Sequence, residues 1–439
     1  MELTVTQVLS PLATRYRTNQ ISESRDQIGF WLSVLLLCLL PIEHWRFPFN
    51  LKPADLALVL LTLYGLLKAW RTHQRLDFPL LLPMWVILFS SLLATLVGFG
   101  SPESIIAIVQ EIYLFSWFIV LTNILKTVPS SDTDRLMKIW SVIACLESVT
   151  TVMGMLRIGP SIFYRSSYEQ VDMEIVRATG TYDNSNAAAM YLSVSFFILL
   201  ATSWPTWLRS VLGVWLFVGM LGTGSNGALL STLGSLVVLA GVHAIIRNRQ
   251  DARLWAAVIG IGVGMVAVVL FTLGLSTSLP SGFGLDTRDP LLFQTLGRLS
   301  HSVTSRLDIL AWAWKTYSRH PWGTGPNSFA SGLHNDYAAF WFERGPLGII
   351  GWLWLIAATL LRPLQVANQL ANKHRRWQVL VLGAGFLACA VNAFSHEISH
   401  MRQVWMLMAL LFASGYANLT RQATSSPTIT ELDTVKRVA

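Results

Sequence analysis

Charged residues and cysteines are both scarce in this chain. Only 13% of its 439 residues are Asp, Glu, Lys or Arg, about half the share of a typical soluble domain. The three cysteines, Cys38, Cys145 and Cys389, lie inside apolar runs, which argues against a disulfide framework or a thiolate metal site. Residues 1–26 are polar and mixed in charge, so no cleavable signal peptide is expected.

Long apolar runs dominate what is present. Apolar residues make up 53% of the chain, which also holds 18 tryptophans. Runs of about 18 to 24 mostly apolar residues recur along the chain, and these identify an integral membrane protein. We predict an all-α, polytopic fold in which residues 1–439 form a single transmembrane domain of about twelve helices. The predicted spans are 27–43, 54–70, 78–98, 104–126, 135–157, 185–204, 208–223, 227–246, 254–275, 335–361, 378–395 and 402–420.

The distribution of lysine and arginine predicts the orientation of these spans. An even number of spans places both termini on one side, and most of the 32 basic residues fall on that side, which the positive-inside rule assigns to the cytoplasm. The net charge of +8 then reflects these loops, and no nucleic-acid partner is expected. Residues 158–184 become a first periplasmic loop, residues 276–334 a large periplasmic loop before the tenth helix, and residues 421–439 a cytoplasmic tail.

Basic residues also gather in or beside the two long loops. As a group they suit bidentate recognition of phosphate on the outer side of a membrane, although the simpler interpretation of any single one is a solvated exterior face. Within the larger loop, residues 299–318 have apolar side chains at helical spacing, which predicts an amphipathic helix at the membrane surface with Trp312 and Trp314 at the interface. The basic residues are Arg157, Arg165, Arg177, Arg288, Arg298, Arg306, Lys315, Arg319 and Arg344.

A histidine in the large loop is the main candidate for chemistry. His334 lies just before the predicted span 335–361, and an imidazole can take a proton from a hydroxyl near neutral pH. The alternative is an interfacial histidine bonded to a loop carbonyl. Asn335 either orients the imidazole or caps the following helix. Gly345-Pro346 is predicted to break the span, and broken backbone at membrane depth is tolerated where it is buried in protein or lines a cavity.

These residues carry a family resemblance. His334-Asn335, nine residues, then Gly345-x-x-Gly348 resembles the H-[NSQ]-x9-G-x-x-G signature of bacterial O-antigen ligases (lipid A–core:surface polymer ligases) and the related O-linked oligosaccharyltransferases. Upstream, His320-Pro321-x-Gly323-x-Gly325 is similar to the P-x-x-G-x-G of the wider ligase and polymerase superfamily. Arg306 leads an aromatic helix into it, as in the family pattern.

The resemblance extends to an earlier loop, with one departure. Arg177-Ala-Thr-Gly180-Thr-Tyr-Asp-Asn184-Ser-Asn186 resembles the family's R-x-x-G-x-F-x-N-x-N, with Tyr182 in place of Phe. Where the family often has Ser-Arg-Gly, this chain has Ser225-Asn226-Gly227. If that arginine binds phosphate in relatives, another residue must do so here.

The resemblance implies a lipid-diphosphate-dependent glycosyltransferase. Such an enzyme moves a glycan from undecaprenyl diphosphate to a lipid A–core hydroxyl on the periplasmic face of the inner membrane, among membrane lipids. His334 is the expected general base with Asn335 beside it, and Gly325, Gly345 and Gly348 are motif glycines. The activated donor needs no nucleotide or other cofactor, and no metal ligands are expected. The expected diphosphate-binding residues are Arg306, Arg288 and Arg177, followed by Arg298 and Arg319.

Four alternatives remain open at this stage. An O-antigen or exopolysaccharide polymerase and a protein O-oligosaccharyltransferase share the scaffold and the donor. His396-Glu397-Ile398-Ser399-His400 is a literal H-E-x-x-H, which on one helix would bind zinc as in a membrane metalloprotease. Twelve spans would also permit a transporter, for which Glu111 and Glu147 are the candidate embedded acids, although each is expected to face a partner within the bundle. The oligomeric state is left open.

Overall fold

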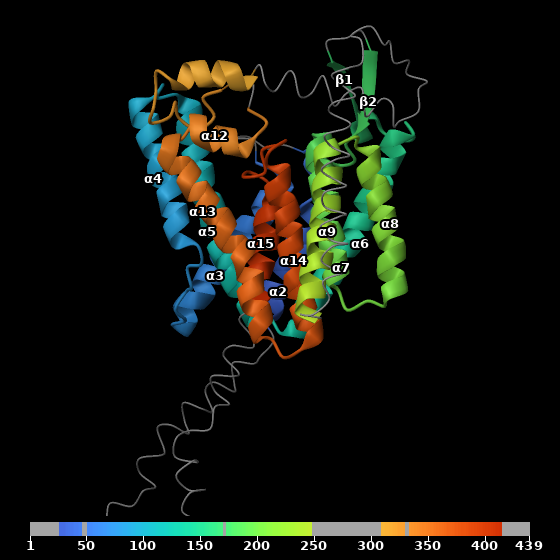
Figure 1. Cartoon of the computed structure of the whole chain (residues 1–439). Coiled ribbons are helices and arrows are strands. Elements are labelled where there is room, and N and C mark those ends of the chain that lie inside the picture. The colour runs from blue at the N-terminus through green and yellow to red at the C-terminus, as the bar shows by residue number, and fades with distance from the viewer. Residues whose placement is uncertain (1–25, 46–50, 170–172, 248–308, 330–332, 415–439) are drawn as a thin grey trace, which may run out of the picture.

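The fold is a bundle of helices with a small β-hairpin and the short helix α12 at one end. The computed structural model describes residues 26–45, 51–169, 173–247, 309–329 and 333–414. Helix α12 and the β1–β2 hairpin lie at the same end of the bundle (Figure 1), which we call the hairpin end. The helices, in chain order, are α2 (Gln27–Leu39), α3 (Pro53–Thr72), α4 (Leu81–Val97), α5 (Pro102–Thr127), α6 (Ser130–Met155), α7 (Ser185–Ala201), α8 (Thr206–Gly222), α9 (Asn226–Arg247), α12 (Asp336–Phe342), α13 (Gly345–Gln369), α14 (Lys373–Asn392) and α15 (Arg402–Ser414).

Eleven of the predicted spans overlap helices α2 to α9 and α13 to α15, with differences of several residues at some ends. The ninth predicted span, 254–275, lies outside the described residues. Within the described part of the chain, five helices are long and apolar enough to cross a membrane, namely α3, α5, α6, α9 and α13. By length and composition the chain is therefore a multi-pass membrane protein.

Helix boundaries follow local signals in the sequence. Pro53 and Pro102 stand in the first turns of α3 and α5, where proline's fixed φ suits the helix and its missing N–H needs no partner. The Ser101 hydroxyl accepts a hydrogen bond from the Ser104 N–H, and the Asn184 side chain accepts one from the Asn186 N–H. These capping bonds satisfy N–H groups that a helix leaves unpaired at its start.

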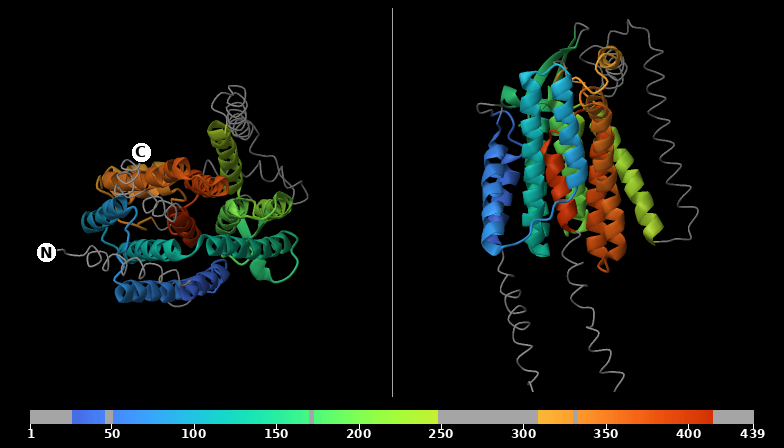
Figure 2. Two further views of the ribbon diagram at one scale, coloured as in Figure 1. Left: turned by 90° about the horizontal axis from the view of Figure 1, so that it is seen from below. Right: turned by 90° about the vertical axis from the view of Figure 1, so that its left-hand side faces the viewer.

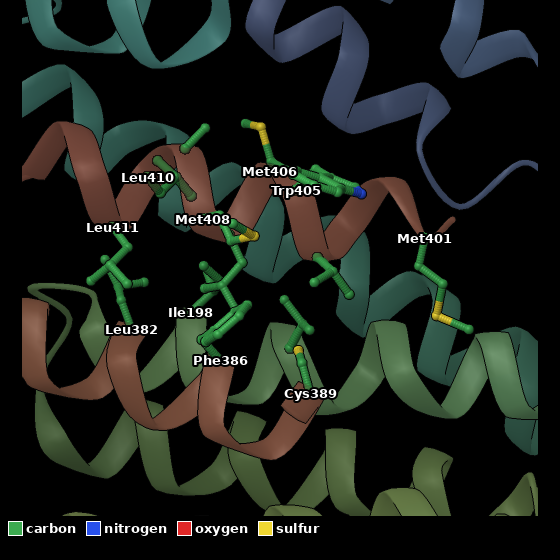
Figure 3. Packing of buried hydrophobic residues seen from close by; sticks show 14 of the residues in the cluster. Ile198, Leu382, Phe386, Cys389, Met401, Trp405, Met406, Met408, Leu410 and Leu411 are labelled. Atoms are coloured by element: carbon green, nitrogen blue, oxygen red, sulfur yellow. The ribbon is translucent and has the colours of Figure 1, made fainter. Parts of the chain in front are cut away.

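The core lies around α15, which is buried along its length. Every residue from Gln403 to Ser414 is buried, and α15 occupies the middle of the bundle when seen along its axis (Figure 2). Leu411 of α15 lies beside Leu382 of α14, and Ile198 of α7 reaches the same cluster (Figure 3). The outer helices α3 and α4 instead expose many large apolar side chains, as expected of helices that face lipid.

A β-hairpin in the first long loop is absent from the prediction. β1 (Tyr164–Glu169) pairs antiparallel with β2 (Met173–Ala178), so that Arg165 lies opposite Arg177. A short 3-10 turn, η3 (Ser161–Phe163), precedes it. Hydropathy windows of about 19 residues do not detect strands of this length. The all-α prediction therefore holds for the bundle and misses this small hairpin.

The large loop contains part of the predicted amphipathic helix. Residues 309–317 are helical, and the rest of the predicted segment, residues 299–308, lies outside the described residues. Ala313 is buried, and Ile309, Leu310 and Tyr317 pack against the same apolar cluster, while Lys315 is exposed, so the helix is amphipathic where it is described. Trp312 and Trp314 are exposed. The predicted span 335–361 is broken at Gly345-Pro346, because α12 ends at Phe342 and α13 begins at Gly345.

Candidate functional site

The glycine-rich segment 320–326 is held between two pairs of helices. On one side it bonds the junction between α12 and α13, and on the other it bonds the turn between α4 and α5. The segment is thus fixed mainly through its backbone groups, and the Thr324 hydroxyl adds a longer bond to the Phe342 carbonyl at 3.4 Å. The bonds run from the Thr324 N–H to the Phe342 carbonyl (3.2 Å), from the Gly325 N–H to the Glu343 carbonyl (2.9 Å), from the Phe99 N–H to the Thr324 carbonyl (3.1 Å) and from the Ser104 hydroxyl to the Pro326 carbonyl (2.8 Å).

Close backbone approach accounts for the glycines of both motifs. Gly323 and Gly345 have φ of +99° and +73°, a region that L side chains rarely adopt. A Cβ on Gly345 would lie 2.6 Å from the Trp322 carbonyl carbon, and one on Gly325 would lie 2.6 Å from the Ser104 hydroxyl. A Cβ on Gly348 would lie 2.9 Å from the Phe340 carbonyl oxygen. The two motifs therefore form one closely packed unit.

Arg344, between α12 and α13, is buried in a network of two carboxylates. Its Nε and one terminal nitrogen donate to Glu111 of α5 at 2.8 and 2.6 Å, and its other terminal nitrogen donates to Glu343 at 3.3 Å. The guanidinium also stacks over the Phe340 ring at 4.3 Å. Burial raises the pKa of Glu343 to about 7, although Arg344 opposes the shift. This arginine therefore joins the helix break to α5 and is not displayed for a ligand.

His334 stands at the start of α12 in a constrained backbone conformation. Its φ is +49°, its side chain is exposed, and its N–H donates to the Glu397 carboxylate at 3.2 Å. The Asn335 side chain accepts a hydrogen bond from the Ala338 N–H at 3.1 Å and caps α12. Of the two roles expected for Asn335, the structure displays the cap. The His334 side chain is thus exposed, whereas the Asn335 side chain stabilises the start of α12.

Asp336 joins the same helix start to the turn that follows α14. Its carboxylate accepts hydrogen bonds from the Ile398 N–H (2.8 Å), the Ser399 N–H (3.0 Å) and the Ser399 hydroxyl (2.8 Å). The Asp336 N–H donates to the Ala393 carbonyl at 2.9 Å. Burial, and then the nearby charge of Glu397, raise the pKa of Asp336 to about 7.

The H-E-x-x-H sequence lies in this turn and not on a helix. Residues 393–401 form turns and bends between α14 and α15, so His396 and His400 do not stand one helical turn apart as a zinc protease requires. Burial lowers the pKa of His400. Among the described residues no group of three or more His, Cys, Asp or Glu side chains is arranged to hold a metal ion. The helical geometry behind the protease alternative is therefore wrong, and we call residues 393–401 the α14–α15 turn.

Arg177 belongs to a second polar group that touches the α14–α15 turn. Its guanidinium donates to the Asn186 side chain at 2.8 Å and to the Thr223 carbonyl at 3.1 Å. It thereby bonds within its own R-x-x-G-x-Y-x-N-x-N motif and also to the end of α8, two residues before the Ser225-Asn226-Gly227 segment. Gly227 in that segment packs directly on Ser395, and a Cβ there would lie 2.7 Å from the Asn392 side-chain oxygen.

A further ion cluster ties the start of α15 to α3. The Arg402 guanidinium donates to both carboxylate oxygens of Asp55 at 2.7 and 2.6 Å. The Tyr113 hydroxyl donates to Asp55 at 3.0 Å, and Lys52 pairs with Glu43 at 2.6 Å close by. This cluster holds the other end of the α14–α15 turn in place.

The two embedded acids face partners within the bundle, as expected. Glu111 accepts from Arg344 and from the Ser91 hydroxyl at 2.8 Å. Glu147 accepts from the Thr181 N–H at 3.0 Å and from the Thr181 hydroxyl at 2.5 Å. These bonds join each acid to a neighbouring segment, so each carboxylate has a structural partner within the protein.

The structure places only some of the expected site residues. Arg306, Arg288 and Arg298 lie outside the described residues, and Arg319 is exposed beyond the helix 309–317. His334 and the Arg177 group are brought to one end, and both touch the α14–α15 turn. Sequence reasoning missed Asp336 and Glu397 as site residues. Asp336 stands two positions after His334, which was a usable signal, whereas nothing local links Glu397 to a residue 63 positions away.

The class of protein is now defined: a multi-pass, α-helical membrane protein with a polar site at one end of its bundle. Residues 211–353 match the family model described as O-Antigen ligase, whose members are ligase- or polymerase-type transferases. The match confirms the resemblance read from the motifs. It spans the Ser225-Asn226-Gly227 segment and the His334 and Gly345 motifs, less than half of the chain, and leaves out Arg177 and the α14–α15 turn. No curated protein matches the chain.

Proposed function

We propose that this protein is an O-antigen ligase-type glycosyltransferase that moves a glycan from undecaprenyl diphosphate to a sugar hydroxyl of lipid A–core. The observation that carries the proposal is the position of His334. It is an exposed imidazole on a fixed backbone, inside the segment that matches the O-antigen ligase family. A histidine in that setting suits proton transfer from an acceptor hydroxyl.

In the proposed reaction the acceptor hydroxyl attacks the anomeric carbon of the donor. Its proton passes to the His334 imidazole while the new C–O bond forms. The bond between the anomeric carbon and the diphosphate oxygen breaks, and undecaprenyl diphosphate leaves with the electron pair. Guanidinium groups stabilise the charge that grows on the leaving oxygen. Arg177 and Arg319 are the candidates for this task within the described residues, and Arg306, Arg288 and Arg298 are the others.

The distribution of charge supports a periplasmic site at the inner membrane. The end of the bundle opposite the hairpin end carries the basic last turn of α3, with Arg71, and the basic first turn of α14, with Lys373. The positive-inside rule assigns such an end to the cytoplasm. The hairpin end, with His334, then faces the periplasm, where the acceptor and the lipid-linked donor meet.

Replacement of His334 by alanine tests the proposal. The expected result is loss of glycan transfer by about 100-fold or more, the effect of removing a general base, with normal membrane insertion. The measurement is long-chain lipopolysaccharide in a strain that carries only the variant, together with the amount of inserted protein. His73→Ala is the matched control, because His73 is also exposed and has φ of +50° but follows α3 at the other end of the bundle.

Near-normal transfer by His334→Ala would show that His334 is not the general base.

A strain that lacks the protein distinguishes a ligase from a polymerase and from a protein O-oligosaccharyltransferase. A strain without a ligase accumulates finished glycan on the lipid carrier, whereas a strain without a polymerase accumulates single repeat units on it. Loss of glycan from a protein with unchanged lipopolysaccharide would instead identify a protein O-oligosaccharyltransferase.

A further inference from the structure

The α14–α15 turn contains the His396-Glu397-Ile398-Ser399-His400 sequence, which has no role in the proposed function so far. Its Glu397 accepts a hydrogen bond from the His334 N–H. We propose that Asp336 is a positioning residue for His334, because its carboxylate fixes the α14–α15 turn, and with it Glu397, against the start of α12. This inference rests on the proposed function and adds a residue that acts through the turn and not on substrate.

The Asp336 side chain cannot touch substrate, since it is 1% exposed. Its polar groups are already committed to the protein. Residue 336 bonds both ends of the turn, through the Ala393 carbonyl at one end and through the Ile398 and Ser399 N–H groups at the other. The register between α12 and the turn is therefore set at this residue.

Glu397 lies between those two anchors and accepts the N–H of His334. That bond crosses the same junction as the Asp336 bonds, since His334 lies two residues before Asp336 and Glu397 lies directly before Ile398. The left-handed backbone of His334 is unfavourable for a non-glycine residue, so it persists only where its neighbours hold it. The Glu397 bond supplies this support only while the turn stays in place.

Removing the Asp336 carboxylate would leave two buried N–H groups without acceptors, since Ile398 is fully buried and Ser399 nearly so. Unpaired groups of this kind are unfavourable enough to rearrange a turn. The Glu397 carboxylate would move with it, and His334 would lose its N–H partner. The imidazole would remain present but would be displaced from its reactive position.

Two substitutions separate this role from others. Asp336→Asn keeps an oxygen that can accept both N–H bonds and places an amide that can donate to the Ser399 hydroxyl. Asp336→Ala keeps none of these bonds. With the purified full chain, undecaprenyl-diphosphate-linked glycan as donor and lipid A–core as acceptor, we expect Asp336→Ala to lower kcat by about 100-fold with KM for the donor little changed, as for a misplaced catalytic group. Asp336→Asn should retain most of the activity.

Two further measurements distinguish a positioning role of Asp336 from a loss of stability of the whole fold. In Asp336→Ala, amide hydrogen exchange should speed up together in peptides covering 333–340 and 393–401, while α7 peptides stay unchanged. Glu397→Ala combined with Asp336→Ala should be no slower than the slower single variant, because both act through one junction.

Asp26→Ala is the matched control. Asp26 also binds a backbone N–H, that of Gly29 at 2.9 Å, and pairs with Lys68, but at the other end of the bundle, so kcat should not change.

The outcomes divide cleanly. Wild-type kcat in Asp336→Ala, with an inactive His334→Ala, overturns the positioning role and leaves the proposed function intact. An Asp336→Asn variant as inactive as Asp336→Ala also overturns it, because the charge and not the set of bonds would then matter. Full activity in His334→Ala overturns the proposed function itself.

Discussion

The two arginine–carboxylate clusters at the hairpin end differ in the exposure of their arginines and in the partners of their carboxylates. The Arg344 side chain is 2% exposed and lies between two carboxylates, Glu111 and Glu343. The Arg402 side chain is 16% exposed and binds Asp55 through two nitrogens. Each cluster ties a part of the site to an outer helix, α5 in the first case and α3 in the second.

The partners that remain determine what happens when each cluster loses its arginine, because a buried carboxylate left without a cation is strongly unfavourable. Glu111 keeps only the Ser91 hydroxyl among the bonds described above, whereas Asp55 keeps the Tyr113 hydroxyl and the Lys52 N–H. The Arg344 cluster also holds one more acid than base. The raised pKa of Glu343 reduces this imbalance, because the carboxyl is partly protonated near neutral pH. The Arg344 cluster is therefore the more sensitive of the two.

Arg344→Ala should have the largest effect on stability, a loss of about 3–5 kcal/mol as for other broken buried pairs. Arg402→Ala should cost less, about 1–3 kcal/mol, because Asp55 keeps the hydrogen bonds from the Tyr113 hydroxyl and the Lys52 N–H. Thermal unfolding of the two purified variants in the same detergent measures the difference. The double variant Glu111→Gln/Arg344→Met, which removes both charges, should recover part of the first loss. Equal losses for the two single variants would contradict the comparison.

Substitution of Gly323 tests how tightly the protein is packed beside the Arg344 cluster. A Cβ at Gly323 would clash with the Glu343 carbonyl and lie 2.9 Å from the Ala94 side chain, where helices hold the backbone on both sides. We expect Gly323→Ala to cost about 2–3 kcal/mol, the range of a strained and overpacked site. Gly100→Ala is the control, since Gly100 also has positive φ, +61°, but its nearest neighbour would be 3.7 Å away. Its cost should be only about 1 kcal/mol, again measured by thermal unfolding.

The pH dependence of stability gives the smallest expected effect. The pKa of Glu343 is raised to about 7 in the folded protein by burial, so the folded state holds a proton that the unfolded state releases at lower pH. The stabilising contribution of that proton is complete below the unfolded pKa and is lost as pH rises through about 7. Between about pH 6 and about pH 8 the wild type should lose roughly 1 kcal/mol relative to Glu343→Gln. Unfolding of both proteins across this range measures it, and parallel pH profiles would contradict the expectation.

Helices and their breaks were predictable because their causes are local. Apolar runs, the prolines at 53 and 102, and the Gly345-Pro346 break all act within a few residues of the place where they are found. The capping role of Asn335 was one of two expected outcomes for the same reason. The H-E-x-x-H sequence misled because its meaning depends on a helix, and α14 ends at Asn392, just before it.

Long-range pairs were not predictable from one sequence. Arg344 and Glu111 are 233 positions apart, and Arg402 and Asp55 are 347 apart, so no periodicity links them. Arg344 was grouped with arginines suited to phosphate because it follows a long outer loop, yet its side chain is buried against Glu111. The Arg177 motif was found by resemblance, but its bond to the Thr223 carbonyl depends on how α8 ends beside the hairpin.

The central position of α15 has a consequence for how a bilayer acts on this protein. Membranes of different thickness change the tilt of helices that face lipid, and α3 and α4 are such helices here. The turn that holds His334 is instead continuous with α15, which protein surrounds along its length. We therefore expect His334, the proposed base, to keep its geometry when hydrophobic mismatch tilts the periphery of the bundle, so that the proposed transfer depends little on acyl-chain length.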